Sequence, residues 1–318
     1  MGGNLIITQY QLYPENADFD FNTCKLYTSN LFNASLGVYD SNARKMETII
    51  EFPNVTNAPD FHLAGVQLNP RTNLISLVAG SGVPFSTNGK TLSGTDLYLQ
   101  YDPQAQKVVR SANLSALSQS RIGGYQDVDH DPDNNAYIVS TFPASIIKVN
   151  TARNTSELWY QSDNIEARTP GFAGIATKDW TLIANDRATG GLFNFDMRAA
   201  QGVPVPIRTT PNHTSHEADG MQLPPKYDGR VLLVAEQGVG ASVFRDLKGE
   251  WKEAEFMGVV PYNDTASNVT KVLQMGNSIY MNIEVFTDNG VMGPGLAGNR
   301  SEFMYVDVTE KVEALLKR

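Results

Sequence analysis

The stretch AGVQLNPRTNLISLVA, from Ala64 to Ala79, decides the fold because it recurs in modified form along the chain. An alternating first strand, Ala64 to Pro70, is followed by a tight turn and a more apolar second strand, Asn73 to Ala79. Alternation with a period of two indicates a half-buried strand, and Gly, Pro, Asn and Asp between strands indicate turns. The sequence is therefore built from a repeated β unit.

The same order of strands appears in the other units. Comparable first strands are Gln126 to Pro132, Ala173 to Asp179, Asp219 to Pro225 and Thr270 to Gly276. Second strands are Asn135 to Thr141, Trp180 to Asp186, Arg230 to Glu236 and Ser278 to Glu284, with a further copy at Cys24 to Ser29. A third strand ends each unit at Asp40, Asp102, Asn150, Asp196, Asp246 and Asp307. These ends recur about every 53 residues, a spacing typical of propeller blades.

The sequence thus predicts an all-β fold, a six-bladed β-propeller with four-stranded blades that forms a single domain over residues 1–318. We expect the N-terminal strand, Leu5 to Tyr10, to close the ring beside Ser278 to Glu284 and Glu302 to Asp307. Two jelly-roll or sandwich domains are the alternative, but they would not require one strand order six times. Helical periodicity is confined to Glu310 to Arg318.

Charge and composition argue against nucleic acid as a partner and against a membrane span. The chain has 25 basic and 34 acidic residues and a net charge of −9, so the cationic surface that nucleic acid requires is not expected. No apolar run approaches the roughly 18 residues that span a bilayer. Cys24 is the only cysteine, which excludes an intrachain disulfide and a Cys-rich zinc site.

The acceptor pattern for N-glycosylation is more frequent than the roughly three or four copies that composition predicts. We therefore expect a secretory or extracellular glycoprotein, although a polar, turn-rich surface would also account for the pattern. Met1-Gly2-Gly3 has neither the basic nor the apolar segment of a signal peptide, so either one was removed, as a secretory route requires, or there never was one. The eight candidate sites are Asn33, Asn54, Asn113, Asn154, Asn212, Asn263, Asn268 and Asn299.

A functional site is expected over one mouth of the propeller channel. The first strand of each blade lines the channel, and the segments that enter it share a face with the connections from second to third strands. The longest of these connections, Gly80 to Thr95 and Val285 to Ser301, are expected to act as lids or binding loops. Candidate substrate-binding residues on this face are Asp60, His62, Tyr125, Phe142, Phe172, Arg187, Glu236, Glu284 and Phe286.

We predict neither a metal nor another cofactor. Some six-bladed propellers of the gluconolactonase and senescence-marker type hold a divalent metal with Glu, Asn and Asp at the starts of successive first strands. Here Asp219 matches, but the other blades have Ala64, Gln126 and Ala173. One carboxylate does not supply the six or more oxygens that a hard cation takes. A metal-dependent lactonase or hydrolase remains the alternative enzyme, with His62, Asp60 or Glu284 as further donors.

Three segments, Asp60 to Gly82, Gly123 to Asn150 and His216 to Gly238, resemble a fungal family of secondary-metabolite propellers. That family includes the trichothecene-cluster protein and the hetero-Diels–Alderases of tropolone-sesquiterpenoid pathways. The resemblance covers most of the chain but rests on strand patterns, not on a catalytic motif. It implies an inverse-demand cycloaddition of a tropolone ortho-quinone methide, formed by loss of water, with a humulene- or caryophyllene-type sesquiterpene.

Four side chains on the predicted site face are candidates for this chemistry. As hypotheses, His216 or Asp219 acts as general acid for the departing hydroxyl, and Gln126 and Asn185 hydrogen-bond the polarised carbonyl. Aromatic side chains would hold the terpene, and the other explanation for them is packing between blades. A propeller that binds a small molecule without catalysis is the remaining alternative.

Overall fold

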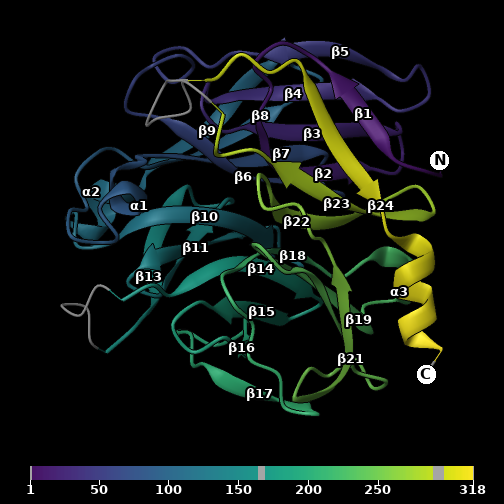
Figure 1. Ribbon diagram of the computed structural model, residues 1–318. Coiled ribbons are helices and arrows are strands. Elements are labelled where there is room, and N and C mark those ends of the chain that lie inside the picture. The colour runs from purple at the N-terminus through teal and green to yellow at the C-terminus, as the bar shows by residue number, and fades with distance from the viewer. Residues whose placement is uncertain (1, 164–168, 289–296, 318) are drawn as a thin grey trace.

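The computed structural model describes residues 2–163, 169–288 and 297–317, and its strands lie in several twisted sheets (Figure 1). Four sheets contain four strands each. The first has β2 (Pro14–Asp20), β3 (Lys25–Asn30), β4 (Ser35–Asp40) and β5 (Lys45–Ile50). The second has β6 (His62–Asn69), β7 (Leu74–Gly80), β8 (Leu97–Asp102) and β9 (Lys107–Asn113). The third has β10 (Gly123–His130), β11 (Ala136–Phe142), β12 (Ser145–Asn150) and β13 (Thr155–Gln161). The last has β22 (Asn268–Met275), β23 (Ser278–Glu284), β24 (Glu302–Asp307) and β1 (Leu5–Thr8).

The remaining strands form one eight-stranded sheet. Its first half has β14 (Phe172–Lys178), β15 (Thr181–Asp186), β16 (Gly191–Asp196) and β17 (Val205–Thr210). Its second half has β21 (Glu253–Pro261), β20 (Gly240–Arg245), β19 (Val231–Glu236) and β18 (Ala218–Gln222). The halves are joined by β17 and β21, which pair in parallel with Arg208 opposite Glu253.

The predicted propeller of six separate four-stranded blades is therefore wrong. The described strands form four separate four-stranded blades and one eight-stranded sheet. Two blades join because the outermost strand of a blade leaves its backbone N–H and C=O groups unpaired. The edges β17 and β21 satisfy one another, and a repeat in the sequence does not report such edge pairing.

The last sheet takes up the N-terminal strand. β1 pairs antiparallel with β24, with Leu5 opposite Tyr305 and Thr8 opposite Glu302, which confirms the predicted closure by the N-terminal segment. Apolar side chains fill the space between this sheet and the first one, among them Tyr305, Leu273 and Phe19. Their burial stabilises the fold by about 25 cal/mol per Å² of apolar surface.

Helices are few and short. In the part of the chain that the structure describes, they are α1 (Val83–Ser86), α2 (Leu114–Ser118), the 3₁₀ turn η2 (Pro225–Tyr227) and the C-terminal α3 (Thr309–Leu316), which packs beside β21 and β23. In the described part of the chain, no helix combines the length and the apolar character that crossing a membrane requires.

The inner strands contact one another in cyclic order around the channel: β2, β6, β10, β14, β18, β22 and again β2. Polar side chains tie neighbouring strands together. Asp18 Oδ2 accepts a hydrogen bond from Leu68 N at 2.8 Å, and Asp129 Oδ2 accepts one from Thr177 N at 2.7 Å. Gly65 allows β6 to approach β10 closely, since a Cβ at that residue would lie 2.6 Å from Gln126 O. Buried acidic residues are thus part of the structure of the channel wall.

Each inner strand carries an irregularity near its start. The register with the second strand shifts between Pro14 and Asn16 in β2. Equivalent shifts follow Leu63 in β6, Tyr125 in β10, Phe172 in β14, Ala218 in β18 and Val269 in β22. Such bulges twist a strand and re-aim side chains, often next to functional sites. Here they place Glu15, Ala64, Gln126 and Asp219 at one mouth of the channel.

Candidate functional site

A cavity of about 320 Å³, which we call the front pocket, lies at the face where the inner strands begin. Its volume falls in the range of about 300–1,000 Å³ that is usual for small-molecule sites. Six of the residues proposed from the sequence line it: His62, Tyr125, Gln126, Arg187, Asp219 and Phe286. A pocket therefore lies on the face that the order of strands indicated.

Aromatic side chains form much of the pocket wall. Phe32, Phe85 and Phe286 line it. The rings of Phe32 and His62 meet edge to face with centroids 5.5 Å apart. Phe85 belongs to α1, so the connection from Gly80 to Thr95 folds against the pocket and contributes a wall. The second expected lid, Val285 to Ser301, includes residues 289–296, which lie outside the described residues.

The carboxyl groups of Glu15 and Asp219 both line the front pocket, but their environments differ. Glu15 on β2 is 8% exposed, and its Oε2 accepts no hydrogen bond from any residue that the structure describes. Burial, followed by the nearby carboxylates of Asp219 and Asp127, raises the pKa of Glu15 well above its usual value. These surroundings therefore favour the protonated form of Glu15.

Asp219 has the more polar environment of the two carboxyl groups. Burial raises its pKa too, but Arg187 and a hydrogen bond from Gln237 Nε2 to Asp219 Oδ2, at 2.5 Å, oppose that rise. Neighbouring carboxyl groups whose environments differ in this way divide into an acid and a base. The pair can hold one proton on Glu15 and one negative charge on Asp219.

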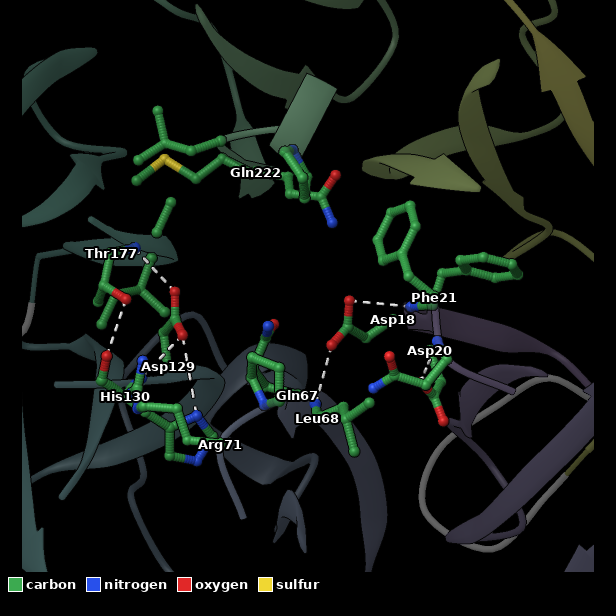
Figure 2. A pocket seen from close by; sticks show the side chains of 18 residues that line it. Asp18, Asp20, Phe21, Gln67, Leu68, Arg71, Asp129, His130, Thr177 and Gln222 are labelled. Carbon is green, nitrogen blue, oxygen red and sulfur yellow. Dashed lines mark hydrogen bonds and ion pairs between the residues drawn. The ribbon is translucent and has the colours of Figure 1, made fainter. Parts of the chain in front are cut away.

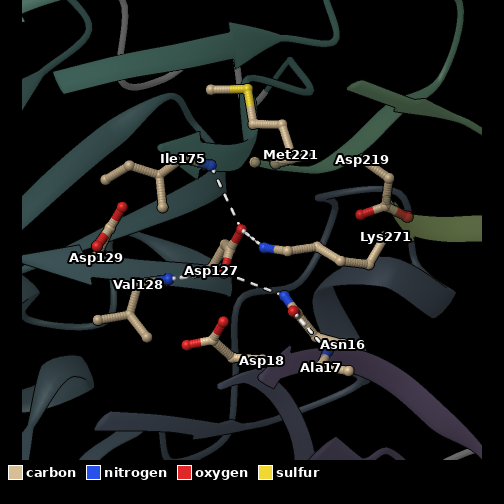
Figure 3. Close-up of polar contacts among 12 residues, drawn as sticks. Asn16, Ala17, Asp18, Asp127, Val128, Asp129, Ile175, Asp219, Met221 and Lys271 are labelled. Carbon is tan, nitrogen blue, oxygen red and sulfur yellow. Dashed lines mark hydrogen bonds and ion pairs between the residues drawn. The ribbon is translucent and has the colours of Figure 1, made fainter. Parts of the chain in front are cut away.

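A buried ion pair lies close to Asp219 inside the channel (Figure 3). The Lys271 side chain reaches from β22 across the channel, and its Nζ lies 3.0 Å from Asp127 Oδ2. Asp127 Oδ1 accepts hydrogen bonds from Asn16 Nδ2 at 3.1 Å and Val128 N at 3.0 Å. Burial lowers the pKa of Lys271, but Asp127 and other nearby carboxylates outweigh that effect and raise it. The lysine is therefore a permanent cation inside the channel.

A second cavity of about 340 Å³, the rear pocket, lies at the opposite mouth (Figure 2). Burial raises the pKa of Asp18 to about 7 and that of Asp129 to about 6. However, both oxygens of each carboxyl group already accept backbone hydrogen bonds. Their placement is explained by the ties between inner strands, so the front pocket is the better candidate site.

Two of the four proposed catalytic residues lie outside the front pocket. Asn185 is fully buried: its Oδ1 accepts from Gly174 N at 3.0 Å and its Nδ2 donates to Asp219 O at 2.6 Å. It positions the strand that carries Asp219. The His216 side chain is exposed and does not line the cavity, and its backbone N donates to Glu236 Oε2.

The other proposed binding residues do not line the pocket. Phe142 packs behind Phe85 with ring centroids 5.6 Å apart. Phe172 belongs to an interior aromatic cluster, and Asp60 is exposed. Glu284 is fully buried, and burial raises its pKa well above the usual value.

Glu236 belongs to a separate polar group. Its Oε1 lies 2.9 Å from His213 Nε2, and Ser242 Oγ lies 3.2 Å from the same nitrogen. A catalytic triad needs the nucleophile and the acid on opposite ring nitrogens. The group therefore has the composition of a triad without its geometry.

The described residues contain no grouping of three or more His, Cys, Asp or Glu side chains placed to hold a metal ion. The proposed donors His62, Asp60 and Glu284 do not converge with Asp219. Instead, the Lys271 ammonium provides positive charge among the channel carboxylates. The donor set therefore does not fit the metal site of a lactonase.

Sequence reasoning missed several residues of the site. Glu15 lies in PENADFD, an inner strand whose sequence does not alternate between apolar and polar residues. The signal for this strand was the copy of the second strand at Cys24 to Ser29, because a first strand precedes the second strand in the other units. Lys271 was within a predicted first strand but was not considered as part of the site. Phe32 and Phe85 complete the wall, and of the two only Phe85 lies in a connection, Gly80 to Thr95, that the sequence placed over the site.

Comparisons with known proteins give the family. No family model matches the chain. It is 32% identical to Trichothecene biosynthesis protein 14 of Trichoderma arundinaceum, over 99% of this chain and 90% of the relative. It is 29% identical to Core trichothecene cluster protein 14 of Fusarium sporotrichioides, over 99% and 87%.

Solved structures share the fold. The Malassezia sympodialis allergen Mala s 1 superposes with a TM-score of 0.79 at 19% identity, with 96% of each chain covered. A gluconolactonase of Xanthomonas campestris superposes with a TM-score of 0.57 at 11% identity, over 95% of this chain and 89% of the other. These identities support the fold alone. The full-length match to the Trichoderma protein shows that this chain belongs to the family of trichothecene-cluster protein 14.

Proposed function

We propose that the protein is an enzyme of secondary-metabolite biosynthesis. In this proposal it removes water from a hydroxymethyl tropolone and joins the resulting ortho-quinone methide to a humulene- or caryophyllene-type sesquiterpene by hetero-Diels–Alder cycloaddition. The names of both relatives refer to trichothecene biosynthesis, which supports a role in a secondary pathway. The observation that carries the proposal is the pair Glu15 and Asp219 in an aromatic pocket.

The pair matches the proton balance of the dehydration. Glu15 donates its proton to the departing hydroxyl, the C–O bond breaks with its electrons on oxygen, and water leaves. Asp219 accepts the proton of the ring hydroxyl, and that O–H electron pair becomes the new ring carbonyl as the exocyclic C=C forms. No proton is gained or lost overall. Transfer of the proton from Asp219 back to Glu15 restores the pair.

The cycloaddition requires confinement of two partners. Holding reactants in a reactive geometry can lower a barrier by about 7–11 kcal/mol. Phe32, Phe85 and Phe286 offer apolar surface for the olefin. Gln126 lies on the polar side, and its Oε1 accepts no hydrogen bond from the described residues, so it can accept one from the ring hydroxyl. The pocket thus separates an apolar partner from a polar one.

The proposal is tested by incubating the protein with a hydroxymethyl tropolone and humulene, and measuring adduct yield and enantiomeric excess against buffer. Glu15→Gln and Asp219→Asn should each lower the rate about 10²- to 10⁴-fold. Glu51→Gln and Asp133→Asn, which change exposed carboxylates outside the pocket, serve as matched controls. Adduct formed at the buffer rate and without enantiomeric excess would refute the proposal.

A second substrate separates the two steps. With a precursor that releases the quinone methide spontaneously, Glu15→Gln should still give an enantiomerically enriched adduct, because confinement does not need the proton. Saturable binding without product would instead indicate the non-catalytic propeller. Hydrolysis of lactones that a chelator abolishes would indicate the metal-dependent alternative.

A further inference from the structure

Arg187 is the only Lys or Arg among the described residues that line the front pocket. It follows directly after β15, at the face where the pocket opens. Its side chain is only 13% exposed, and its Nη2 forms an ion pair with Glu217 Oε2. The pocket therefore contains one cationic group, held at its rim.

The partner of Arg187 is far less buried than Arg187 itself. The Glu217 side chain is 66% exposed, and Glu217 has a left-handed backbone with φ of 45°. Exposed carboxylates are well solvated, so such an ion pair contributes little to stability and is readily exchanged. Asp219, the other acidic neighbour of Arg187, is buried and held by Gln237. Of the two carboxylates, Glu217 is the one that a ligand can replace.

We propose that Arg187 is the specificity-determining residue of the front pocket, and that it binds the adjacent carbonyl and acidic hydroxyl oxygens of the substrate ring in place of Glu217. A guanidinium group presents donors in a planar fork, which suits two neighbouring oxygens. The identity of the ring rests on the proposed function. The recognition itself rests on Arg187 and its replaceable partner.

This arrangement agrees with the role of Asp219. When the ring hydroxyl gives its proton to Asp219, negative charge develops on the ring oxygen beside Arg187. A fixed cation at that place stabilises the charge as it forms. The same contact places the ring so that its hydroxymethyl group can reach Glu15, on the other side of the pocket mouth.

Binding of tropolone and of tropone, which lacks the hydroxyl, tests the proposal without any turnover. Titration calorimetry should show that the protein binds tropolone at least about 10-fold more tightly than tropone. Arg187→Met should abolish this preference while leaving tropone binding unchanged. Glu217→Gln removes the competing carboxylate, so it should strengthen tropolone binding several-fold. Asp133→Asn is the control.

Equal affinity for the two compounds, or a preference that survives in Arg187→Met, would overturn the proposal. If Arg187→Met does not fold, Glu217→Gln still decides, because unchanged or weaker tropolone binding contradicts the displacement of Glu217. A preserved preference without any adduct formation would refute the proposed function and leave the recognition by Arg187 in place. The two failures are thus distinguishable.

Discussion

Lys271 of the last sheet and Asp127 of the third sheet form an ion pair across the channel, and their side chains are 2% and 1% exposed. Removing one member of a buried pair leaves the other charged group without compensation, at a cost of about 3–5 kcal/mol. We expect Lys271→Met and Asp127→Asn each to lower the free energy of unfolding by this amount in urea denaturation.

The double variant should be less destabilised than the two single variants together, because it leaves no unpaired charge. Lys252→Met is the matched control, since Lys252 pairs with Glu250 on the surface, where the side chains are 75% and 56% exposed. Its effect should stay below about 1 kcal/mol. Additive losses for Lys271 and Asp127 would show that the pair does not act as a unit.

The N-terminal strand offers a test of ring closure with two adjacent isoleucines. Ile7 is fully buried between the last and first sheets, whereas Ile6 is 56% exposed. Ile7→Ala should destabilise the protein by about 2–5 kcal/mol, and Ile6→Ala by less than about 0.5 kcal/mol. Thermal unfolding of both variants would check this. Similar effects of the two substitutions would contradict packing of β1 in the observed register.

The apolar second strands were predictable because their side chains face other sheets on both sides. Asn73 to Ala79 and Arg230 to Glu236 correspond to β7 and β19 within one residue at each end. The inner strand β2 was not, because Glu15, Asn16, Asp18 and Asp20 are buried by contacts with other inner strands. Hydrophobic patterns cannot detect a strand whose buried side chains are mostly polar.

The sequence predicted on which face of the fold the candidate site lies, but not which side chains form it. The order of strands placed His62, Tyr125 and Asp219 at one mouth, where they line the front pocket. The pairing of Glu15 with Asp219 could not be predicted, because it depends on the bulges that direct both side chains into the cavity. The joining of β17 to β21 likewise depends on how two edges meet in space.

Buried carboxyl groups should make the protein less stable as pH rises. Asp18, with a folded pKa of about 7, and Asp129, with one of about 6, hold protons that the unfolded chain releases near pH 4. Their contribution is complete below about pH 4 and is lost as pH rises through the folded pKa. His130, whose pKa burial lowers to about 3, acts in the opposite direction below about pH 6.5.

We expect the carboxyl groups to dominate, so that the melting temperature is at least about 2 °C lower at pH 8 than at pH 5.5, the effect of roughly 1 kcal/mol. Asp18→Asn should make this dependence smaller, because an amide does not titrate. Asp133→Asn, at an exposed residue, should leave it unchanged. A melting temperature that rises steadily from pH 5.5 to 8 would refute the raised pKa values.

The eight glycosylation motifs are not equally accessible to modification. Asn33 is half-buried, and its Nδ2 donates to Gln11 O at 3.0 Å, a bond that a glycan on that nitrogen would remove. Asn268 is half-buried in β22. Asn113 is exposed, and its Oδ1, which caps α2 by accepting from Ala116 N, remains available after modification.

Expression through a eukaryotic secretory pathway should therefore modify Asn54, Asn113, Asn154, Asn212, Asn263 and Asn299, which are exposed, and leave Asn33 and Asn268 free. Enzymatic deglycosylation in H₂¹⁸O converts each modified Asn to labelled Asp, and peptide mass spectrometry then reports every site. Asn33→Gln should not change the pattern. Full occupancy at Asn33 would mean that the chain is modified before the segment around Gln11 packs against it, since Asn33 Nδ2 donates to Gln11 O in the folded structure.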